Sequence, residues 1–515
     1  MVLTLTPLSV LATTGGKNHV SDDKDLPKTG FEDRNGNGWT TLDEEAAFLE
    51  EVASKSDRVT YSQVGTSVEG RPIYLAKVGF PVPPSDKDIA AGRNILIEGT
   101  PHGNEPSGRE MALKLLRNLA FTDDPEMLDL LSKSTVLFMP TPNPDGRHAN
   151  IRTNINGIDI NRDHINLETP EGQAEEKILN KYHPDIILDA HERPRDVGNP
   201  DLEVLWPRNF NVDEQLRQLN IEMVQDYVRP DVEKDDFTTG LYGTPPGSGS
   251  GSERILRNMS GLRHSLGMLA ETPGKAEPKA RVRMHMDAAK SVLRFYHERF
   301  DDVGKVVAEA PKRSAAAGAN QDPFYLDGTY GWDQSKYPPV ILDPAPCGYL
   351  ITKSQAEKIS TNIKLFSLEN EKIGNNGVFF TMNQPMRTVV PLLLDEGASY
   401  NEVDGIPLYS CTNPGTAANM KTLVSHFEDK GDIKDSQAAH ELNMHLTAVE
   451  HFEKKEAAKK VVKHMKGFKT LLNHQKENQL ISERASSILD HYADYLIEKW
   501  DVDFDADKAM DHIRH

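Results

Sequence analysis

A histidine and a glutamate stand three residues apart in Pro101–Glu105, directly after an apolar run that ends at Glu98. His102 and Glu105 can both reach one metal ion from a tight loop, because Gly103 lets the backbone turn between them. The His-x-x-Glu spacing is common, and without further ligands it would indicate only a polar loop.

Two more groups of this kind follow apolar runs later in the chain. His191 comes after Ile186–Leu188, and Glu271 comes directly after Leu266–Ala270. The carboxyl ends of parallel strands meet at one edge of an open α/β sheet, where ligands bind. An unpaired buried carboxylate at each strand end would be costly, so we expect these groups to share one site.

Such a site needs a sheet with helices packed on it. Residues 39–303 alternate short apolar runs with amphipathic helical patterns, which predicts the α/β class. The expected strands are Ile73–Val78, Asn94–Glu98, Val136–Pro140, Ile186–Ala190 and Gly267–Ala270. The expected helices are Thr41–Ser54, Ser107–Leu119, Pro170–Lys181 and Val282–Glu298.

Three further regions flank this one. Residues 1–38 are polar and predict a leader and linker. Within this segment, Val2–Ala12 is similar to the apolar part of a truncated signal peptide, and the alternative is a frayed N-terminal tail. Residues 304–430 contain short β-like runs, including 378–380 and 389–394, and favour a small β-rich accessory domain.

Residues 431–515 predict a helical accessory domain. Within it, residues 436–500 have almost no Gly or Pro, and their apolar residues recur at helical spacing, which predicts two or three antiparallel helices. The histidines of this segment are scattered among Lys and Glu, so solvated helix faces explain them better than a metal site.

Composition narrows the function. A chain of 515 residues predicts two or three domains. The formal net charge of -20 argues against a nucleic-acid partner, because phosphate binding requires clustered Lys and Arg. No apolar run is long enough to span a bilayer. With the signal-like start, we expect a secreted, extracellular protein.

Five motifs occur in order along the chain. They are Pro101–Glu105, Asn143–Arg147, Arg152–Arg162, Asp189–His191 and Ala270–Gly274. Together they resemble the M14 family of zinc carboxypeptidases, and the segment Trp39–Gly79 resembles the start of its catalytic domain. The resemblance covers about residues 39–300.

The resemblance implies a mixed twisted sheet flanked by helices and one Zn²⁺ per chain. His102, Glu105 and His191 would bind the zinc, which leaves a coordination position open for water. Glu271 would be the general base that takes the proton of this water and passes it to the leaving amine.

Four more residues have roles that are carried over from the motifs. Arg152 would stabilise the oxyanion, and Asn161 and Arg162 would clamp the substrate's C-terminal carboxylate. Asp159 would hold a ligand histidine in the correct tautomer. The alternative interpretations are surface salt bridges for the arginines and a loop-capping role for Asp159.

The sequence departs from the family where studied members carry a tyrosine on a mobile loop. Gly247–Ser252 occupies this neighbourhood, and Tyr242, just upstream, is the candidate for substrate binding. The glycines favour a flexible lid. The position that sets side-chain preference in the family falls near Leu256, which favours apolar or broad preference, but Glu253 is close enough to reverse that prediction.

The expected function is removal of C-terminal residues from peptides or proteins with a free C-terminus. One alternative keeps the site but changes the substrate to cell-wall peptides or acyl-amino acids. Another is a non-catalytic peptide-binding module, against which the presence of Glu271 argues. The helical domain resembles small modules of secreted Gram-positive hydrolases, which implies a cell-surface or protein contact.

Two features leave alternatives open. Cys347 and Cys411 are the only cysteines, and in an exported chain they either pair or remain buried thiols. Asp33, Asn35, Asn37 and Glu44 match a calcium loop, and they also match a turn before a helix capped at Thr41.

Overall fold

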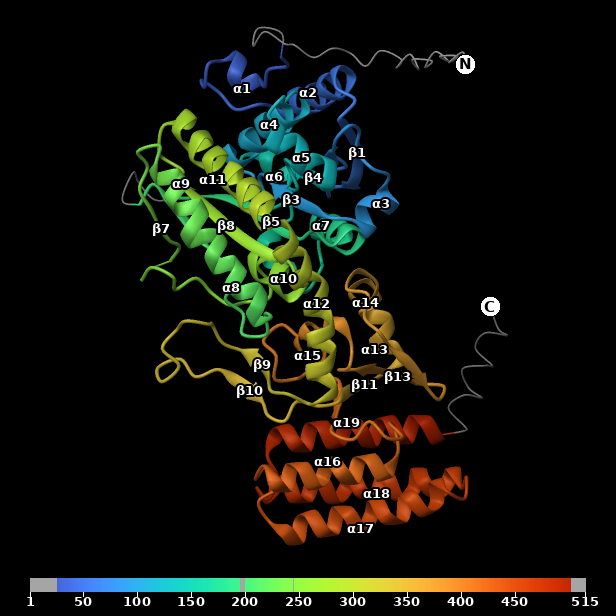
Figure 1. Ribbon diagram of the computed structural model, residues 1–515. Coiled ribbons are helices and arrows are strands. Elements are labelled where there is room, and N and C mark those ends of the chain that lie inside the picture. Colours follow the sequence, from blue (N-terminus) through green and yellow to red (C-terminus); the bar gives the residue numbers. More distant parts are fainter. Residues whose placement is uncertain (1–25, 195–199, 244, 502–515) are drawn as a thin grey trace, which may run out of the picture.

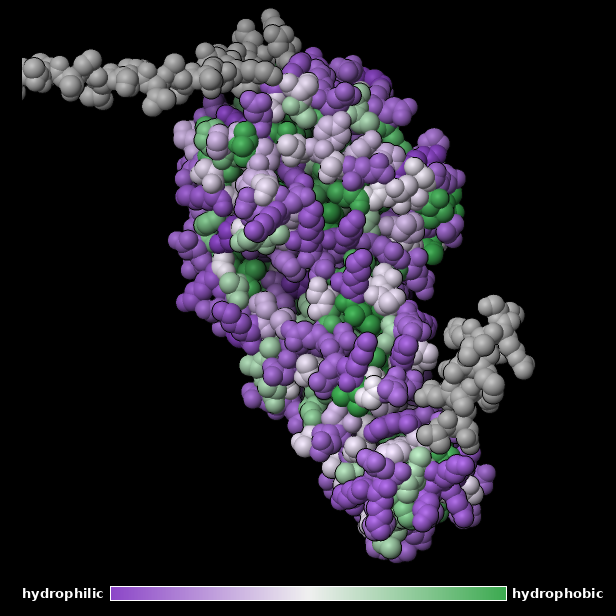
Figure 2. Space-filling view, turned by 90° about the vertical axis from the view of Figure 1, so that its right-hand side faces the viewer, coloured by the Kyte–Doolittle hydropathy of each residue, from purple (hydrophilic) through white to green (hydrophobic). Residues whose placement is uncertain are grey.

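The computed structural model describes residues 26–194, 200–243 and 245–501, so the signal-like segment Val2–Ala12 lies outside the described residues. Figure 1 shows an α/β region at the top, a β-rich region in the middle and a helical bundle at the bottom. Figure 2 shows this elongated outline with a mostly hydrophilic surface. None of the described helices is long and apolar enough to cross a membrane.

An eight-stranded mixed sheet forms the centre of the α/β region, in the order β1-β2-β4-β3-β5-β8-β6-β7. β4, β3, β5 and β8 run parallel, whereas β1, β2 and β6 add antiparallel pairs. The predicted α/β class with a mixed sheet is confirmed, and all five expected strands are present. The strands are β1 (Val59–Thr66), β2 (Pro72–Val78), β3 (Asn94–Glu98), β4 (Thr135–Met139), β5 (Ile186–Arg193), β6 (Leu202–Leu205), β7 (Thr239–Leu241) and β8 (Leu266–Pro273).

Helices cover both faces of this sheet, because its central strands are apolar on both sides. In β3, Ile95 and Ile97 join the core on one face and Leu96 joins the core on the other, as strand alternation requires. The first core includes α2 (Leu42–Lys55), α4 (Ser107–Ala120) and α11 (Pro278–Glu298), and the second includes α3 (Asp86–Ala91) and α7 (Pro170–Tyr182). The four expected helices are therefore present.

Shorter helices connect the strands. Several of them carry the predicted site residues or lie next to them. They are α5 (Pro125–Lys133), α6 (Pro144–Ala149), a 3₁₀ turn at Ile160–Arg162, α8 (Glu214–Glu222), a π-helical turn at Met223–Val228, α9 (Arg229–Glu233) and α10 (Leu256–Leu262).

The described part of the predicted linker, residues 26–38, packs on the α/β region. It contains α1 (Gly30–Asp33), and Phe31 is buried. Arg117 of α4 donates hydrogen bonds to Pro27 O and to Glu32. These residues are therefore part of the fold rather than a linker.

The calcium interpretation is not supported. Both carboxylate oxygens of Glu44 accept hydrogen bonds from Arg34, and Glu44 closes a capping box with Thr41. These contacts, above all those from Arg34, lower the pKa of Glu44 to about 2 despite an opposing effect of partial burial. Asn35 accepts from Lys279 Nζ at 2.6 Å. Cations of the chain thus occupy two of the four expected calcium ligands, and the alternative of a turn and a capped helix is what forms.

The β-rich region follows α12 (Phe300–Ala319), which runs across the expected boundary at 303/304. It has a hairpin of β9 (Phe324–Asp327) and β10 (Val340–Leu342) and a four-stranded sheet of β11 (Gly348–Thr352), β12 (Glu371–Ile373), β13 (Gly377–Thr381) and β14 (Ile406–Leu408). Its helices are α13 (Lys353–Lys358), α14 (Ser360–Leu365) and α15 (Val390–Leu394), with a 3₁₀ turn at Pro385–Thr388.

One expected strand of this region is a helix. The run 378–380 lies in β13, as predicted, but the run 389–394 forms α15. Pro391 lies in the first turn of α15, where a missing N–H costs nothing, and every residue of α15 is buried. A short apolar run that is buried on all sides does not reveal its secondary structure by periodicity.

Residues 436–500 form three helices, in line with the two or three expected, and a further helix before them completes the C-terminal bundle in the described residues. The helices of the bundle are α16 (Ala417–Asp429), α17 (Ser436–Glu453), α18 (Ala458–Glu477) and α19 (Glu483–Trp500). Leu423 and Val424 of α16 share a core with Leu442, Leu446 and Leu489 of the other helices. The bundle therefore begins at α16, and not at residue 431.

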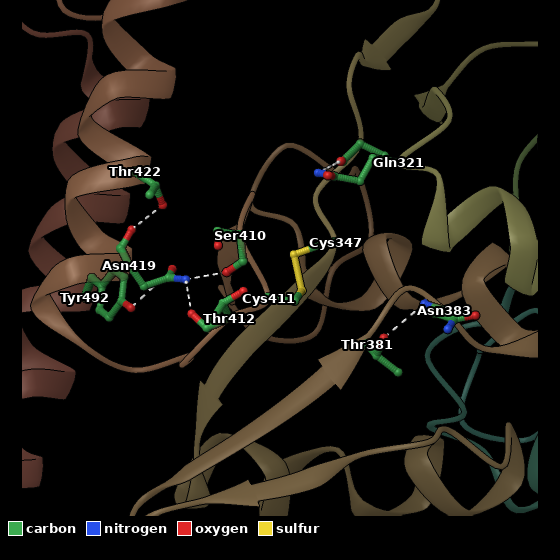
Figure 3. The surroundings of a disulfide bond; sticks show 11 residues. Gln321, Cys347, Thr381, Asn383, Ser410, Cys411, Thr412, Asn419, Thr422 and Tyr492 are labelled. Atoms are coloured by element: carbon green, nitrogen blue, oxygen red, sulfur yellow. Dashed lines mark hydrogen bonds between the residues drawn. A yellow bond between two sulfur atoms is a disulfide. The ribbon is translucent and has the colours of Figure 1, made fainter.

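Cys347 and Cys411 form a disulfide bond, which decides between the two alternatives left open by the sequence. Figure 3 shows this bond beside Asn419 of α16, which donates to the carbonyls of Ser410 and Thr412. The bond therefore joins the sheet of the β-rich region to the segment that leads into the helical bundle.

Candidate metal centre

Three ligand side chains converge at the carboxyl ends of β3 and β5. His102 Nδ1 lies 3.0 Å from Glu105 Oε1, and His191 Nδ1 lies 2.9 Å from Glu105 Oε2 and 3.0 Å from His102 Nδ1. All three side chains are buried. In the part of the chain that the structure describes, no other set of three or more His, Cys, Asp or Glu ligand atoms lies within 4.8 Å of one another.

The loop that carries His102 and Glu105 depends on Gly103. A Cβ atom on Gly103 would lie 1.8 Å from the carbonyl carbon of Gly146 in α6. Arg147 of α6 donates to Gly103 O at 2.6 Å. Glycine is thus required here for a close approach of two backbones, which holds the two ligands against the helix of the Asn143–Arg147 motif.

A carboxylate holds the outer nitrogen of each imidazole. His102 Nε2 lies 3.0 Å from Asp159 Oδ1, and His191 Nε2 lies 2.7 Å from Asp189 Oδ1. When His102 Nε2 donates to Asp159, its Nδ1 is left as an acceptor that faces the centre. The structure therefore places Asp159 where the sequence expects it. The matching role of Asp189 was missed, although Asp189 and His191 are alternate residues of one strand and therefore share a face.

Glu271 lies beside His191, because the two residues are in register on the parallel strands β5 and β8. Glu271 is only 8% exposed. Burial raises its pKa to about 8, an effect that His191 opposes and Glu105 reinforces. A buried carboxyl group with a pKa raised in this way is suited to accept a proton and to release it again.

Glu192, the other carboxylate next to a ligand, is engaged elsewhere. It accepts from the Ser107 backbone N–H at 2.7 Å and is ion-paired with Arg281. Arg281 in turn lies over the ring of Trp39. These contacts turn Glu192 towards the start of α4, and they leave Glu271 as the carboxylate available for proton transfer.

Arg152 and Arg162 approach the centre from the same loop. Arg152 donates to Glu105 Oε1 and to Asp159 Oδ2, both at 3.1 Å, and its side chain is 42% exposed. It therefore lies at the open side of the centre. Arg162 is half-buried, and its Nη1 donates to Asn161 O.

Asn161 is brought to the site, but both ends of its amide contact the protein. Its Nδ2 lies 2.7 Å from His191 Nε2, and its Oδ1 accepts from the Leu256 N–H at 2.9 Å. The side chain is buried at 2% exposure. This placement favours a positioning role for Asn161 and differs from the predicted direct clamp, and the clamp by Arg162 stays a prediction.

Tyr242, the candidate from the sequence, lies just after β7 near the centre. Burial raises the pKa of its hydroxyl group, and the neighbouring Glu271 adds to the effect. Arg257, which the sequence did not single out, also lies here: it is fully buried, and burial lowers its pKa to about 10. No motif marks Arg257, because its neighbours in the sequence are apolar or small.

The two residues considered for side-chain preference lie in different surroundings. Leu256 is fully buried in the core between the sheet and α7. Glu253 is 5% exposed, and burial raises its pKa to about 7. Its Oε1 has no hydrogen-bond partner among the residues that the structure describes. The surroundings of Leu256 and Glu253 do not decide the side-chain preference of the substrate site. The apolar or broad preference therefore stays a prediction.

A cluster of buried charged residues adjoins Asp189. Although burial acts against it, the carboxylates of Glu175 and Glu176 raise the pKa of His164 to about 9. Burial and the nearby Glu175 hold the pKa of Glu98 well above its usual value. The sequence did not reveal this cluster, because Glu175 and Glu176 lie on an amphipathic helix, where charged residues usually indicate a solvent-exposed face.

Known proteins match two parts of the chain. The zinc carboxypeptidase family model matches residues 45–186, and the FIMAH domain model matches residues 417–498. The chain is 29% identical to carboxypeptidase 2 of Trichophyton rubrum over 67% of this chain and 71% of that protein. Carboxypeptidase 2 of Trichophyton equinum is 27% identical, and the chain spans only 57% of its length.

Solved structures give weaker likenesses. A metallo-carboxypeptidase from Burkholderia cenocepacia is 21% identical with a TM-score of 0.41, covering 50% of this chain and 69% of that chain. A carboxypeptidase A from Helicoverpa armigera is 16% identical with a TM-score of 0.42, covering 53% of this chain and 74% of that chain.

The family-model match begins within α2 and ends at the start of β5, and it contains His102, Glu105 and Asp159. The carboxypeptidase relatives extend the match over more of the chain. Residues 45–186 therefore match the zinc carboxypeptidase family M14, and the chain is similar to curated carboxypeptidases.

Proposed function

We propose that the protein is a zinc-dependent exopeptidase that removes C-terminal residues from peptides, with Glu271 as the general base. The observation that carries the proposal is the juxtaposition of Glu271 with the three converging side chains His102, Glu105 and His191. A binding module would have no need of a buried carboxyl group poised to exchange a proton.

The donor set fits zinc. Two imidazole nitrogens and one carboxylate are ligands that catalytic zinc sites use, with a fourth position for water. The donor atoms lie 2.9–3.0 Å apart. Tetrahedral ligands at zinc bond lengths are separated by about 3.3 Å, so a small outward adjustment would admit the ion. Asp159 and Asp189 already orient both imidazoles.

A zinc ion bound there would polarise the scissile carbonyl and lower the pKa of a water molecule. Glu271 takes a proton from the attacking water and passes it to the leaving amine. Arg152 lies at the open side of the centre, where its guanidinium stabilises negative charge that develops on the carbonyl oxygen. Arg162 binds the terminal carboxylate of the substrate through its planar fork.

A free terminal carboxylate on the substrate is the requirement that this proposal places on recognition. Arg162 is half-buried, and the half-buried cation favours a terminal carboxylate. Cell-wall peptides that end in a free carboxylate meet the same requirement, as do acyl-amino acids. These are therefore outcomes of the substrate test rather than separate mechanisms.

Export and a contact role for the bundle complete the proposal. The disulfide bond between Cys347 and Cys411 supports an oxidising compartment outside the cytoplasm. The FIMAH match of the bundle and its separation from the metal centre support a role in attaching the enzyme to a surface or another protein.

The test is a panel of blocked dipeptides with different C-terminal residues, assayed before and after chelation and after zinc is restored. Hydrolysis that chelation removes and zinc restores is the expected result. Cleavage of cell-wall peptides or acyl-amino acids in preference to the dipeptides would change the substrate class. Tight dipeptide binding without hydrolysis at full zinc occupancy would favour the binding module.

A further inference from the structure

The Gly/Ser loop, Gly247–Ser252, is held in place by its neighbours rather than free to move as a lid. Gly247, Gly249 and Gly251 are buried. A Cβ on Gly251 would lie 2.5 Å from Gly328 O, and one on Gly249 would lie 2.5 Å from a Leu205 methyl group. These glycines therefore serve close packing, and the flexible lid that the sequence favoured is not what forms.

The β-rich region supplies part of this packing. Trp332 donates its indole N–H to Ser248 O at 3.0 Å, and the Gly251 N–H donates to Thr329 Oγ1 at 2.9 Å. The donor Trp332 and the acceptor Thr329 belong to the segment Gly328–Trp332, which follows β9 and which we call the strap. Figure 1 shows the β9–β10 hairpin directly below α8 and next to the α/β region.

The α/β region holds the strap firmly. Tyr330 N donates to Arg208 O at 2.7 Å, and Arg208 Nε donates to Tyr330 O at 2.6 Å. The Arg217 guanidinium lies over the Tyr330 ring, 4.1 Å from its centroid. The strap is thus a fixed support for the loop.

The loop leads directly to the predicted carboxylate clamp. After Ser252, Arg254 Nε donates to Arg162 O at 2.7 Å, and Leu256 N donates to Asn161 Oδ1 at 2.9 Å. Asn258 Nδ2 ties the loop to α10 through Ser250 O and Ser252 O. A shift of the loop would therefore be passed to the backbone of Arg162 and to the amide of Asn161.

We infer that Thr329 and Trp332 of the β-rich region are positioning residues for the substrate's terminal carboxylate. They act through the Gly/Ser loop on Asn161 and Arg162, so the α/β region alone does not make a complete substrate site. The inference rests on the proposed function for its kinetic meaning, but the mechanical connection can be tested without it.

The test variant is T329V/W332F in the full-length chain. Valine keeps the shape of threonine without the hydroxyl acceptor, and phenylalanine keeps an aromatic ring without the indole donor. The matched control is T388V/W500F. Thr388 Oγ1 donates to Leu262 O at the far end of α10, and Trp500 Nε1 donates to Glu453 within the helical bundle.

Two readouts are needed. For blocked dipeptides with a free carboxylate, we expect KM of the test variant to rise by about tenfold with kcat nearly unchanged, the loss typical of one or two hydrogen bonds. The inhibition constant of 3-phenylpropionate, a carboxylate without a scissile bond, should rise in parallel. Zinc content and the kinetics of the control should match the wild type.

Hydrogen exchange, followed by mass spectrometry, tests the connection itself. The test variant should exchange faster in residues 247–256 and 160–163, and the control should not. If KM is unchanged, or if exchange in 160–163 is unchanged, the inference is overturned. If the wild type does not hydrolyse peptides, the proposed function fails, and the exchange result alone decides the role of the strap.

Discussion

His191 and Glu271 lie opposite each other in register on neighbouring parallel strands, one in β5 and the other in β8. Alternation along β5 then places Asp189 on the same face as His191, where it is ion-paired with His191 Nε2. A strand pair thus delivers a predicted metal ligand, its carboxylate partner and the predicted base to one side of the sheet. The chemistry of the centre depends on this register, because a shift of β8 by one residue would turn Glu271 to the face opposite His191.

Replacing Glu271 with Gln should separate metal binding from catalysis. Glutamine keeps the shape of the side chain but cannot accept the proton, so zinc should remain bound. A positioned general base contributes about 10²–10⁴-fold, and kcat should fall by at least that amount. Zinc content and kcat should be measured on the same preparation.

Glu192→Gln is the matched control for that prediction. Glu192 directly follows His191 in the sequence, but its carboxylate accepts from the Ser107 N–H and is ion-paired with Arg281. We expect this variant to lose stability and to keep most of its turnover. The opposite pattern, with Glu271→Gln active and Glu192→Gln inactive, would transfer the base to Glu192.

Metal affinity should depend on the carboxylates that hold the histidines. Replacing His191 with Ala removes a ligand and should abolish both zinc binding and activity. Replacing Asp159 with Asn removes the carboxylate 3.0 Å from His102 Nε2. It should weaken zinc binding by about 10–100-fold. Competition with a chelator measures both, and unchanged affinity in Asp159→Asn would show that His102 needs no such partner.

The strands and ligands were predictable for one physical reason. β3, β5 and β8 are buried on both faces, so each is a mostly apolar run with a predicted site residue near its carboxyl end or in the loop that follows. Their order in the sheet and the short loops that follow them bring the ligands together. Residues whose roles depend on contacts far away in the sequence gave no such signal.

Asn161 and the Gly/Ser loop show where the sequence was insufficient. The amide of Asn161 faces His191 and Leu256, and a motif does not specify that orientation. The loop glycines suggested freedom of movement, whereas their environment shows that they are needed to avoid clashes with Gly328 O and Leu205. The glycine content of a loop indicates which backbone conformations it can adopt, and packing against its neighbours determines which one forms.

Replacing Arg162 with Ala should affect the recognition of the terminal carboxylate and leave the metal centre intact. Zinc content should equal that of the wild type. In the part of the chain that the structure describes, the Arg162 side chain makes no hydrogen bond or ion pair with the three ligands. For substrates with a free C-terminal carboxylate, KM should rise by more than tenfold, because a bidentate charged hydrogen bond is lost. Equal effects on amidated and free substrates would assign Arg162 a structural role.

The disulfide bond should stabilise the junction between the β-rich region and the helical bundle. It closes a loop with a sequence separation of 64 residues, for which chain entropy predicts a stabilisation of about 4 kcal/mol. Replacing both Cys347 and Cys411 with Ser should lower the melting temperature to the value that the reduced wild type shows. If reduction leaves the melting temperature of the wild type unchanged, the bond does not contribute.

Glu253 should make the stability of the protein fall as the pH rises. Burial raises its pKa to about 7 in the folded state, whereas an unfolded chain ionises this group near the ordinary value of 4.5. Between these two values the unfolded state releases the proton and the folded state keeps it. The stability that the protonated group contributes is therefore complete below pH 4.5 and is lost by about pH 7. This pKa difference corresponds to a loss of about 3 kcal/mol. Glu253→Gln cannot ionise, so its free energy of unfolding should fall less than that of the wild type over this range. Asp333→Asn is the control, because Asp333 is exposed. Denaturant unfolding at pH 5 and pH 7.5 measures the difference, and parallel pH profiles for wild type and Glu253→Gln would show that Glu253 is ionised in the folded protein throughout.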